Sequence, residues 1–169
     1  MSLIRRMGLL MLAVVLMALA AGVLTTLVAA RDTLQTQLGV KNRDNAQSLA
    51  LALSQQRGDA GLMDVVLLAQ FDTGHYRRIV LRGADGKTLF ERQAAPRQGV
   101  APAWFAKALP IRADSGVAQV SDGWRAMGAL ELDSQSDWAV DALWRAGRGA
   151  TALLALVGLF GALFAVWGL

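Results

Sequence analysis

The distribution of charged and apolar residues divides this chain of 169 residues into three parts. Met7 to Ala30 is a run of 24 residues without a charge, and Gly149 to Leu169 is a second run of 21. A helix rises about 1.5 Å per residue, so each run is long enough to cross a hydrocarbon core of about 30 Å. The pattern therefore predicts transmembrane helices at 7–30 and 149–169, a short segment 1–6 and an intervening domain 31–148.

The first part of the intervening segment has a helical pattern. Arg31 to Arg57 contains no proline and a single glycine, and its apolar residues recur on one helical face together with Asn45. We expect a stalk helix that continues out of the membrane and ends near "QQRGD", with Asn42 and Asn45 making its face partly polar. A second helix over 60–70 follows, with Asp59 as its N-cap and an apolar face made of Leu62, Val65, Val66 and Ala69.

The remaining pattern alternates between strands and short helices. Residues 78–82 alternate between apolar and charged ahead of Asp85-Gly86, a strong hairpin turn, and a return strand with Leu89 and Glu91 follows it. A second strand pair is joined at Gly123-Trp124. Between the hairpins a helix begins at Pro102, and we expect its apolar residues to hold it against a sheet: Trp104, Phe105 and Leu109. Ser136 is expected to cap the last helix. The fold class is α+β: a small PAS-like domain with a long stalk helix, two hairpins and short helices between two transmembrane helices.

Charge and composition set the orientation and exclude several functions. Arg5 and Arg6 precede the first apolar run, which favours cytoplasmic termini and a domain outside the cytoplasm, in an inner membrane. The segment 31–148 carries 15 Lys/Arg and 13 Asp/Glu, interspersed, so we expect no nucleic-acid partner. Val28 and Ala30 also fit a signal-peptidase site, but the length of the uncharged run favours an uncleaved anchor. The absence of cysteine excludes disulfides and a cysteine nucleophile.

The candidate catalytic motifs do not support an enzyme. His75 is the only histidine, so neither a histidine metal pair nor a catalytic triad has a strong basis. The triplet at 72–74 has no second copy to form an aspartic-protease pair, and "RGADGKT" lacks the spacing of a phosphate loop. We therefore expect no enzymatic activity, cofactor or metal. Trp124 stands out instead, because turns usually face water and tryptophan is largely apolar.

Several segments together resemble a known family. They are "MSLIRR", "SLALALS", "FDTGHYRRIVL", "PAWFAKAL", "VSDGWRAMGALEL" and "DALW", in that order over essentially the whole chain. This series resembles the N-terminal periplasmic module that LapD-type cyclic-di-GMP receptors share with MoxY-type sensor kinases.

The resemblance implies a signalling module rather than an enzyme. LapD-type receptors form a domain-swapped periplasmic homodimer that sequesters a periplasmic cysteine protease of the LapG type, which would otherwise release a surface adhesin and so limit biofilm formation. Cytoplasmic cyclic-di-GMP sets that state through domains that are not part of these 169 residues. A tryptophan between the last two strands inserts into the protease. In this chain that residue is Trp124, and Gly123 shapes the turn.

Two other hypotheses stay open. The segment 31–148 can be a ligand-sensing input domain of a MoxY-like histidine kinase, which predicts a buried pocket with His75, Tyr76 and Arg78 as candidate residues. Alternatively, the chain only dimerises, through small residues of the second span: Gly158, Gly161 and Ala162. If Trp124 does not contact a protease, the alternatives are that it folds back over its own sheet or lies in a dimer contact.

Overall fold

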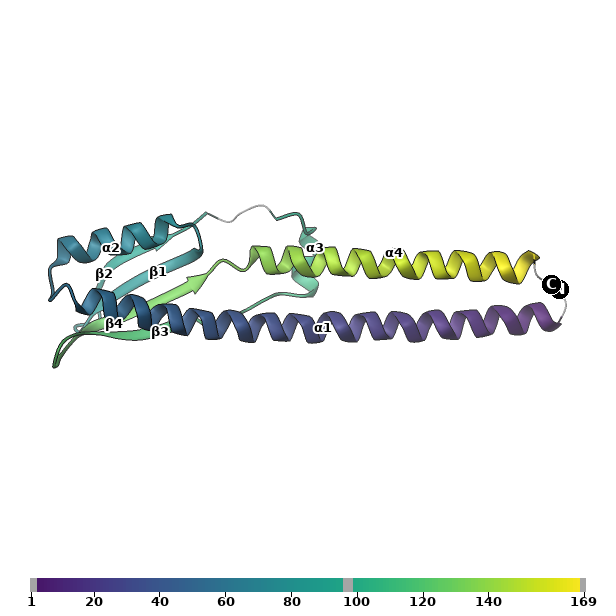
Figure 1. The fold of residues 1–169 in the computed structure, drawn as a ribbon, viewed down its shortest axis with the longest axis horizontal. Coiled ribbons are helices and arrows are strands. Elements are labelled where there is room, and N and C mark those ends of the chain that lie inside the picture. The colour runs from purple at the N-terminus through teal and green to yellow at the C-terminus, as the bar shows by residue number, and fades with distance from the viewer. Residues whose placement is uncertain (1–2, 96–98, 168–169) are drawn as a thin grey trace.

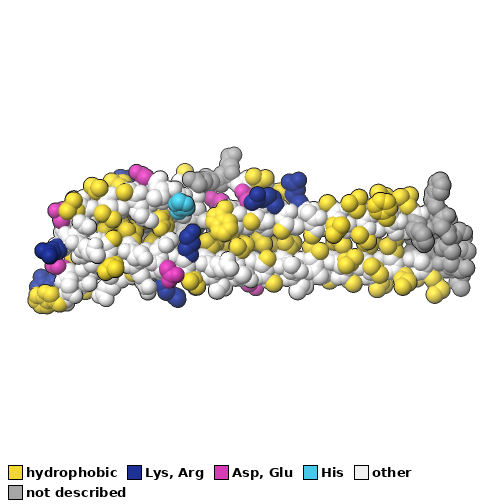
Figure 2. All heavy atoms as spheres, viewed as in Figure 1, with side chains coloured by type: hydrophobic (Ala, Val, Ile, Leu, Met, Phe, Trp, Pro, Cys, Tyr) yellow, Lys and Arg dark blue, Asp and Glu magenta, His cyan; other side chains and the backbone are white. Residues whose placement is uncertain are grey.

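The computed structural model describes residues 3–95 and 99–167 and shows an elongated molecule (Figure 1). Two long helices, α1 (Leu3–Ser54) and α4 (Asp137–Trp167), run side by side along most of its length. A sheet and a further helix form a domain at one end of this pair, and the start of α1 and the end of α4 lie at the other. On the face in Figure 2, no acidic or basic side chain lies over the described part of the helix pair farthest from the domain, as expected of membrane-spanning helices.

Helix α1 joins the predicted first span and the predicted stalk in one element of 52 residues. The continuity is explained by the sequence, which contains no proline between these two segments. A rigid helix therefore leads from the apolar segment directly to the core of the domain. The bounds of the membrane segments themselves stay predictions.

The domain is built on a four-stranded antiparallel sheet, which confirms the α+β class. Its strands are β1 (Tyr76–Gly83), β2 (Thr88–Gln93), β3 (Gly116–Asp122) and β4 (Arg125–Ser134), in the order β2-β1-β4-β3. Both predicted hairpins are present, β1 with β2 and β3 with β4. All four strands come from one chain, and the domain-swapped dimer stays a prediction.

One face of the sheet is covered by the end of α1 and by α2 (Ala60–Asp72). Leu53, Leu67 and Ile79 are almost completely buried at this interface, and each side chain stabilises the fold by about 1.5–3 kcal/mol. Asp59 caps α2 as predicted, since its carboxylate accepts hydrogen bonds from the backbone N–H groups of the first turn.

The predicted apolar face of α2 was wrong except for Val66, which is partly buried against the domain core. Met63 and Leu67 are the buried residues, whereas Leu62 and Val65 are 51% and 62% exposed. Almost every side of this helix carries apolar residues, so its sequence does not distinguish between two neighbouring rotations about the helix axis.

The short helix α3 (Ala103–Ala108) begins after Pro102 as predicted, but it does not pack against the sheet. Phe105 is buried in a second apolar cluster, which lies between α1 and α4 on the membrane side of the sheet and also contains Leu38 and Leu143. The helix faces the α1–α4 pair because the long connections on both sides of α3 carry it away from the strands. Trp104 remains 63% exposed and lies edge-on to Phe105.

A buried polar residue ties the stalk helix to the domain. Asn42 of α1 is 2% exposed, its amide nitrogen donates to the carbonyl oxygen of Asp114 at 2.7 Å, and its amide oxygen accepts from the backbone N–H of Ser134 at 3.0 Å. Both partners lie outside α1, one ahead of β3 and one at the end of β4. The partly polar face predicted for the stalk is thus explained mainly by Asn42, and Asn45 is only half-buried.

Candidate functional site

The tip of the β3–β4 hairpin is a tight turn that points away from the helix pair (Figure 1). Asp122 pairs with Arg125, so Gly123 and Trp124 form a two-residue loop. Gly123 has φ +64°, and the Trp124 N–H donates to the Asp122 carbonyl oxygen at 2.7 Å. A hydrogen bond between residues two positions apart, with positive φ at the central Gly123, describes a γ-turn within the two-residue loop, and glycine adopts this conformation more readily than any other residue. The predicted shaping role of Gly123 therefore has a structural basis.

Trp124 is 91% exposed, more than any other large hydrophobic side chain among the described residues. The guanidinium carbon of Arg125 lies 5.7 Å from the centre of its ring, close enough for a cation–π contact. Figure 2 shows hydrophobic and basic side chains together at this end of the molecule. The alternative that Trp124 folds back over its own sheet is wrong in this structure.

The base of the hairpin is fixed by close backbone contacts. The register of β3 against β4 shifts between Val120 and Ser121, which leaves an additional residue, Met127, on β4. Such a bulge increases the local twist and directs the end of a hairpin. Next to it, a Cβ atom at Gly128 would overlap the carbonyl oxygen of Arg82 on β1, so this position requires glycine. The turn that presents Trp124 therefore extends from a rigid part of the sheet.

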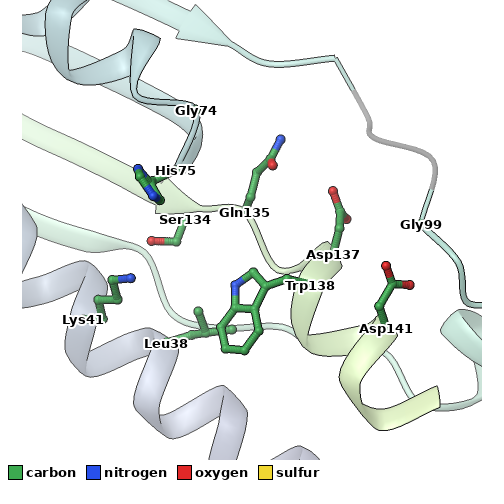
Figure 3. Close-up of a pocket in the computed structure, with 10 residues that line it drawn as sticks. All are labelled: Leu38, Lys41, Gly74, His75, Gly99, Ser134, Gln135, Asp137, Trp138 and Asp141. Atoms are coloured by element: carbon green, nitrogen blue, oxygen red, sulfur yellow. The ribbon is translucent and has the colours of Figure 1, made fainter. Parts of the chain in front are cut away.

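The three candidate residues of the ligand-sensing hypothesis do not converge. Tyr76 is 4% exposed in the domain core, where its hydroxyl group accepts a hydrogen bond from Gln70 at 2.9 Å. Arg78 lies on the uncovered face of the sheet and forms an ion pair with Glu91 at 3.0 Å. Only His75 lines a cavity, which has a volume of about 280 Å³ and lies between the domain and the start of α4 (Figure 3).

Sequence reasoning missed this cavity almost entirely. Its lining comes from α1, from the turn before β1, from the end of β4 and from the first two turns of α4. Residues so far apart in the chain carry no local motif, and the single histidine was the only available signal. The lining residues are Leu38, Lys41, Gly74, His75, Gly99, Ser134, Gln135, Asp137, Trp138 and Asp141.

The small residues of the second span face the first span of the same chain. A Cβ atom at Gly158 would lie 3.5 Å from Leu16, and one at Gly161 would lie 2.6 Å from Leu12. These glycines therefore allow α4 to approach α1 closely, as small residues do between membrane helices. Their contacts in this structure lie within one chain, and a role of Gly158, Gly161 and Ala162 in contacts between two chains stays a prediction.

Fold and site together define a class of protein: an α+β domain on two helices, each long and apolar enough to cross a membrane, with one indole exposed at its distal tip. Residues 23–144 match the model of the LapD/MoxY periplasmic domain, and the chain belongs to this family. The expected resemblance is thereby confirmed. The family is one of signalling domains, so the chain is a periplasmic signalling module with flanking apolar helices, as expected of an inner-membrane protein.

Comparison with solved structures gives a relative of known structure. The solved structure described as the Pseudomonas fluorescence LapD periplasmic domain is 30% identical in sequence, and the match covers 64% of this chain and 87% of that chain. The TM-score of the two structures is 0.36, so the family assignment depends on the family model and not on superposition. No curated protein matches the chain.

Proposed function

We propose that this chain is the transmembrane and periplasmic part of a LapD-like receptor, and that its β3–β4 hairpin binds a periplasmic cysteine protease through Trp124. The observation that carries the proposal is the 91% exposure of this indole on a tight, glycine-shaped turn. The termini are cytoplasmic, cyclic-di-GMP acts on cytoplasmic domains beyond this segment, and sequestration of the protease protects a surface adhesin and favours biofilm formation. Two copies form the receptor, with exchange of elements between their periplasmic domains.

The energetics favour Trp124 as the anchor of such a complex. A tryptophan buries roughly 150–250 Å², and at about 25 cal/mol per Å² this contributes about 4–6 kcal/mol before the costs of association. Truncation of an anchor residue of this kind commonly reduces the binding free energy by about 2 kcal/mol or more. Trp and Arg are among the residue types enriched at such positions. Arg125 lies beside the indole, so both types are present at the tip. The tight turn at Gly123 orders them before binding, which reduces the entropic cost.

The fold also supports a route for the signal. Helix α1 runs without a break from the apolar segment to the covered face of the sheet, and Asn42 connects it to the end of β4, three residues ahead of α4. A change in the geometry of the helix pair would therefore act on the same sheet that carries the Trp124 hairpin. A receptor of this kind requires two arrangements of the helix pair that the protease binds with different affinity.

The proposal is tested by measuring the affinity of the full chain, in lipid nanodiscs, for the purified periplasmic cysteine protease of the organism that carries it. Trp124→Ala should weaken binding about 30-fold, the equivalent of about 2 kcal/mol. Trp104→Ala is the matched control, since it removes another exposed indole from α3 without touching the hairpin. Equal affinity of wild type and Trp124→Ala, or no binding by wild type, would overturn the proposal.

A second candidate function is a ligand-sensing input domain of the MoxY type. The observation that favours it is the cavity beside His75, because it touches both helices that lead to the membrane. A bound molecule there would alter the relation between α1 and α4 directly.

A further inference from the structure

The cavity in Figure 3 lies where the domain meets the helix pair. Leu38 and Lys41 line it from α1, and Trp138 and two aspartates line it from α4. Its volume of about 280 Å³ lies just below the roughly 300–1,000 Å³ of sites for drug-sized ligands, so it suits a smaller metabolite.

The charges of the cavity are separated by sign. Asp137 and Asp141 are one helical turn apart on α4, and Figure 3 shows them on one side of the Trp138 indole, with His75 and Lys41 on the other. Among the residues that the structure describes, no ion pair engages any of these four side chains. One carboxylate oxygen of Asp141 accepts a hydrogen bond from the backbone N–H of Ala101 at 2.8 Å, which leaves the other oxygen for a ligand.

We propose that this cavity binds a small zwitterion that carries an ammonium and a carboxylate group, namely a free α-amino acid. The ammonium group lies against Asp137 and Asp141, next to the face of an indole that attracts cations. On the opposite side, the carboxylate lies against the ammonium group of Lys41 and within reach of the His75 ring, which offers an N–H donor. A ligand with charges of only one sign would place a like charge against one of the two walls, which is unfavourable.

This inference deepens the second candidate function, on which it rests, by naming the class of ligand. The occupied cavity would connect α1, α4 and the end of β4, which are the elements that lead from the sheet to the membrane helices. It is independent of the Trp124 hairpin at the opposite end of the domain. Amino-acid binding is therefore expected to be unchanged in the Trp124→Ala protein, so the failure of one proposal is distinguishable from the failure of the other.

The test uses the full chain in lipid nanodiscs and the twenty common L-amino acids as probes, each measured by titration calorimetry and by its effect on Tm. At least one amino acid should bind and raise Tm. For that probe, the amine that lacks the carboxylate and the acid that lacks the amine should each bind at least about tenfold more weakly.

Two variants locate the binding site. Lys41→Met removes an exposed ammonium group, and Asp137→Asn removes one charge while it leaves the Asp141–Ala101 hydrogen bond intact. Each should weaken binding of the probe at least about tenfold, whereas Asp64→Asn, on the exposed side of α2, should not. The unliganded Tm of each variant establishes that it is folded. Failure of every amino acid to bind, binding unchanged in both cavity variants, or equal binding of the amine or the acid alone would overturn the proposal.

Discussion

Replacement of Asn42 by alanine is expected to destabilise the connection between the stalk helix and the sheet. The change removes two hydrogen bonds, of 2.7 Å to the Asp114 carbonyl and 3.0 Å from the Ser134 N–H, at a side chain that is 2% exposed. A buried polar group that loses its partner costs about 1–3 kcal/mol. Because both hydrogen bonds are part-buried, we expect a total loss of about 2–4 kcal/mol in the free energy of unfolding, or roughly 4–16 °C in Tm for a chain of this size.

Thermal unfolding of the full chain in detergent, followed by circular dichroism, measures this loss. Asn45→Ala is the matched control, since it makes the same change three residues away on the same helix, at a half-buried position. It should leave Tm unchanged or raise it slightly, because alanine is the better helix former. Equal Tm values for Asn42→Ala and Asn45→Ala would refute the argument that Asn42 connects α1 to the β4–α4 segment.

Three further predictions concern the glycines and the topology. Gly123→Ala should lower the free energy of unfolding by about 1–2 kcal/mol, since an L-residue is strained at its φ of +64°, and an unchanged urea midpoint would contradict this. Gly128→Ala should lower the free energy of unfolding by about 3 kcal/mol, at the upper end of the usual range, because a Cβ atom would overlap backbone on β1. Gly149→Ala, with open space around it, should be neutral or stabilising by up to about 1 kcal/mol, and the same urea titration compares the two variants. The chain has no cysteine, so single cysteines can be labelled specifically. Asp85→Cys should react with an impermeant maleimide added to intact spheroplasts and Ser2→Cys should not, whereas the reverse result would place the domain in the cytoplasm.

The sequence predicted those parts of the fold whose signals are local. Alternation around Asp85-Gly86 and Gly123-Trp124 located both hairpins, and Asp59 located the start of α2, because turn and cap chemistry depend on neighbouring residues. The exposure of Trp124 was left open by the sequence, because a tryptophan beside a turn can also fold back over its own sheet, and the structure decides for exposure.

The features that depend on distant contacts were not predictable in this way. The buried face of α2 was misassigned because apolar residues surround the helix, and α3 was placed on the sheet although Phe105 packs between α1 and α4. The charged cavity was missed since Lys41 and Asp137 are 96 positions apart in the chain and meet only after α4 has folded back along α1. The pattern of apolar and polar residues along the chain gives no information on contacts between segments that are distant in sequence.

The central claim is that one exposed indole outside the membrane is buried by another protein, and ¹⁹F NMR tests it most directly. The full chain would be labelled with 5-fluorotryptophan, and the signal of Trp124 assigned as the one lost in Trp124→Phe. In the free chain this signal should show the solvent isotope shift of a ring in water, in line with its 91% exposure. When unlabelled periplasmic cysteine protease is added, the chemical shift of the signal should change and the solvent isotope shift should disappear. A Trp124 signal that is already shielded in the free chain, or that stays unchanged at saturating protease, would contradict the account.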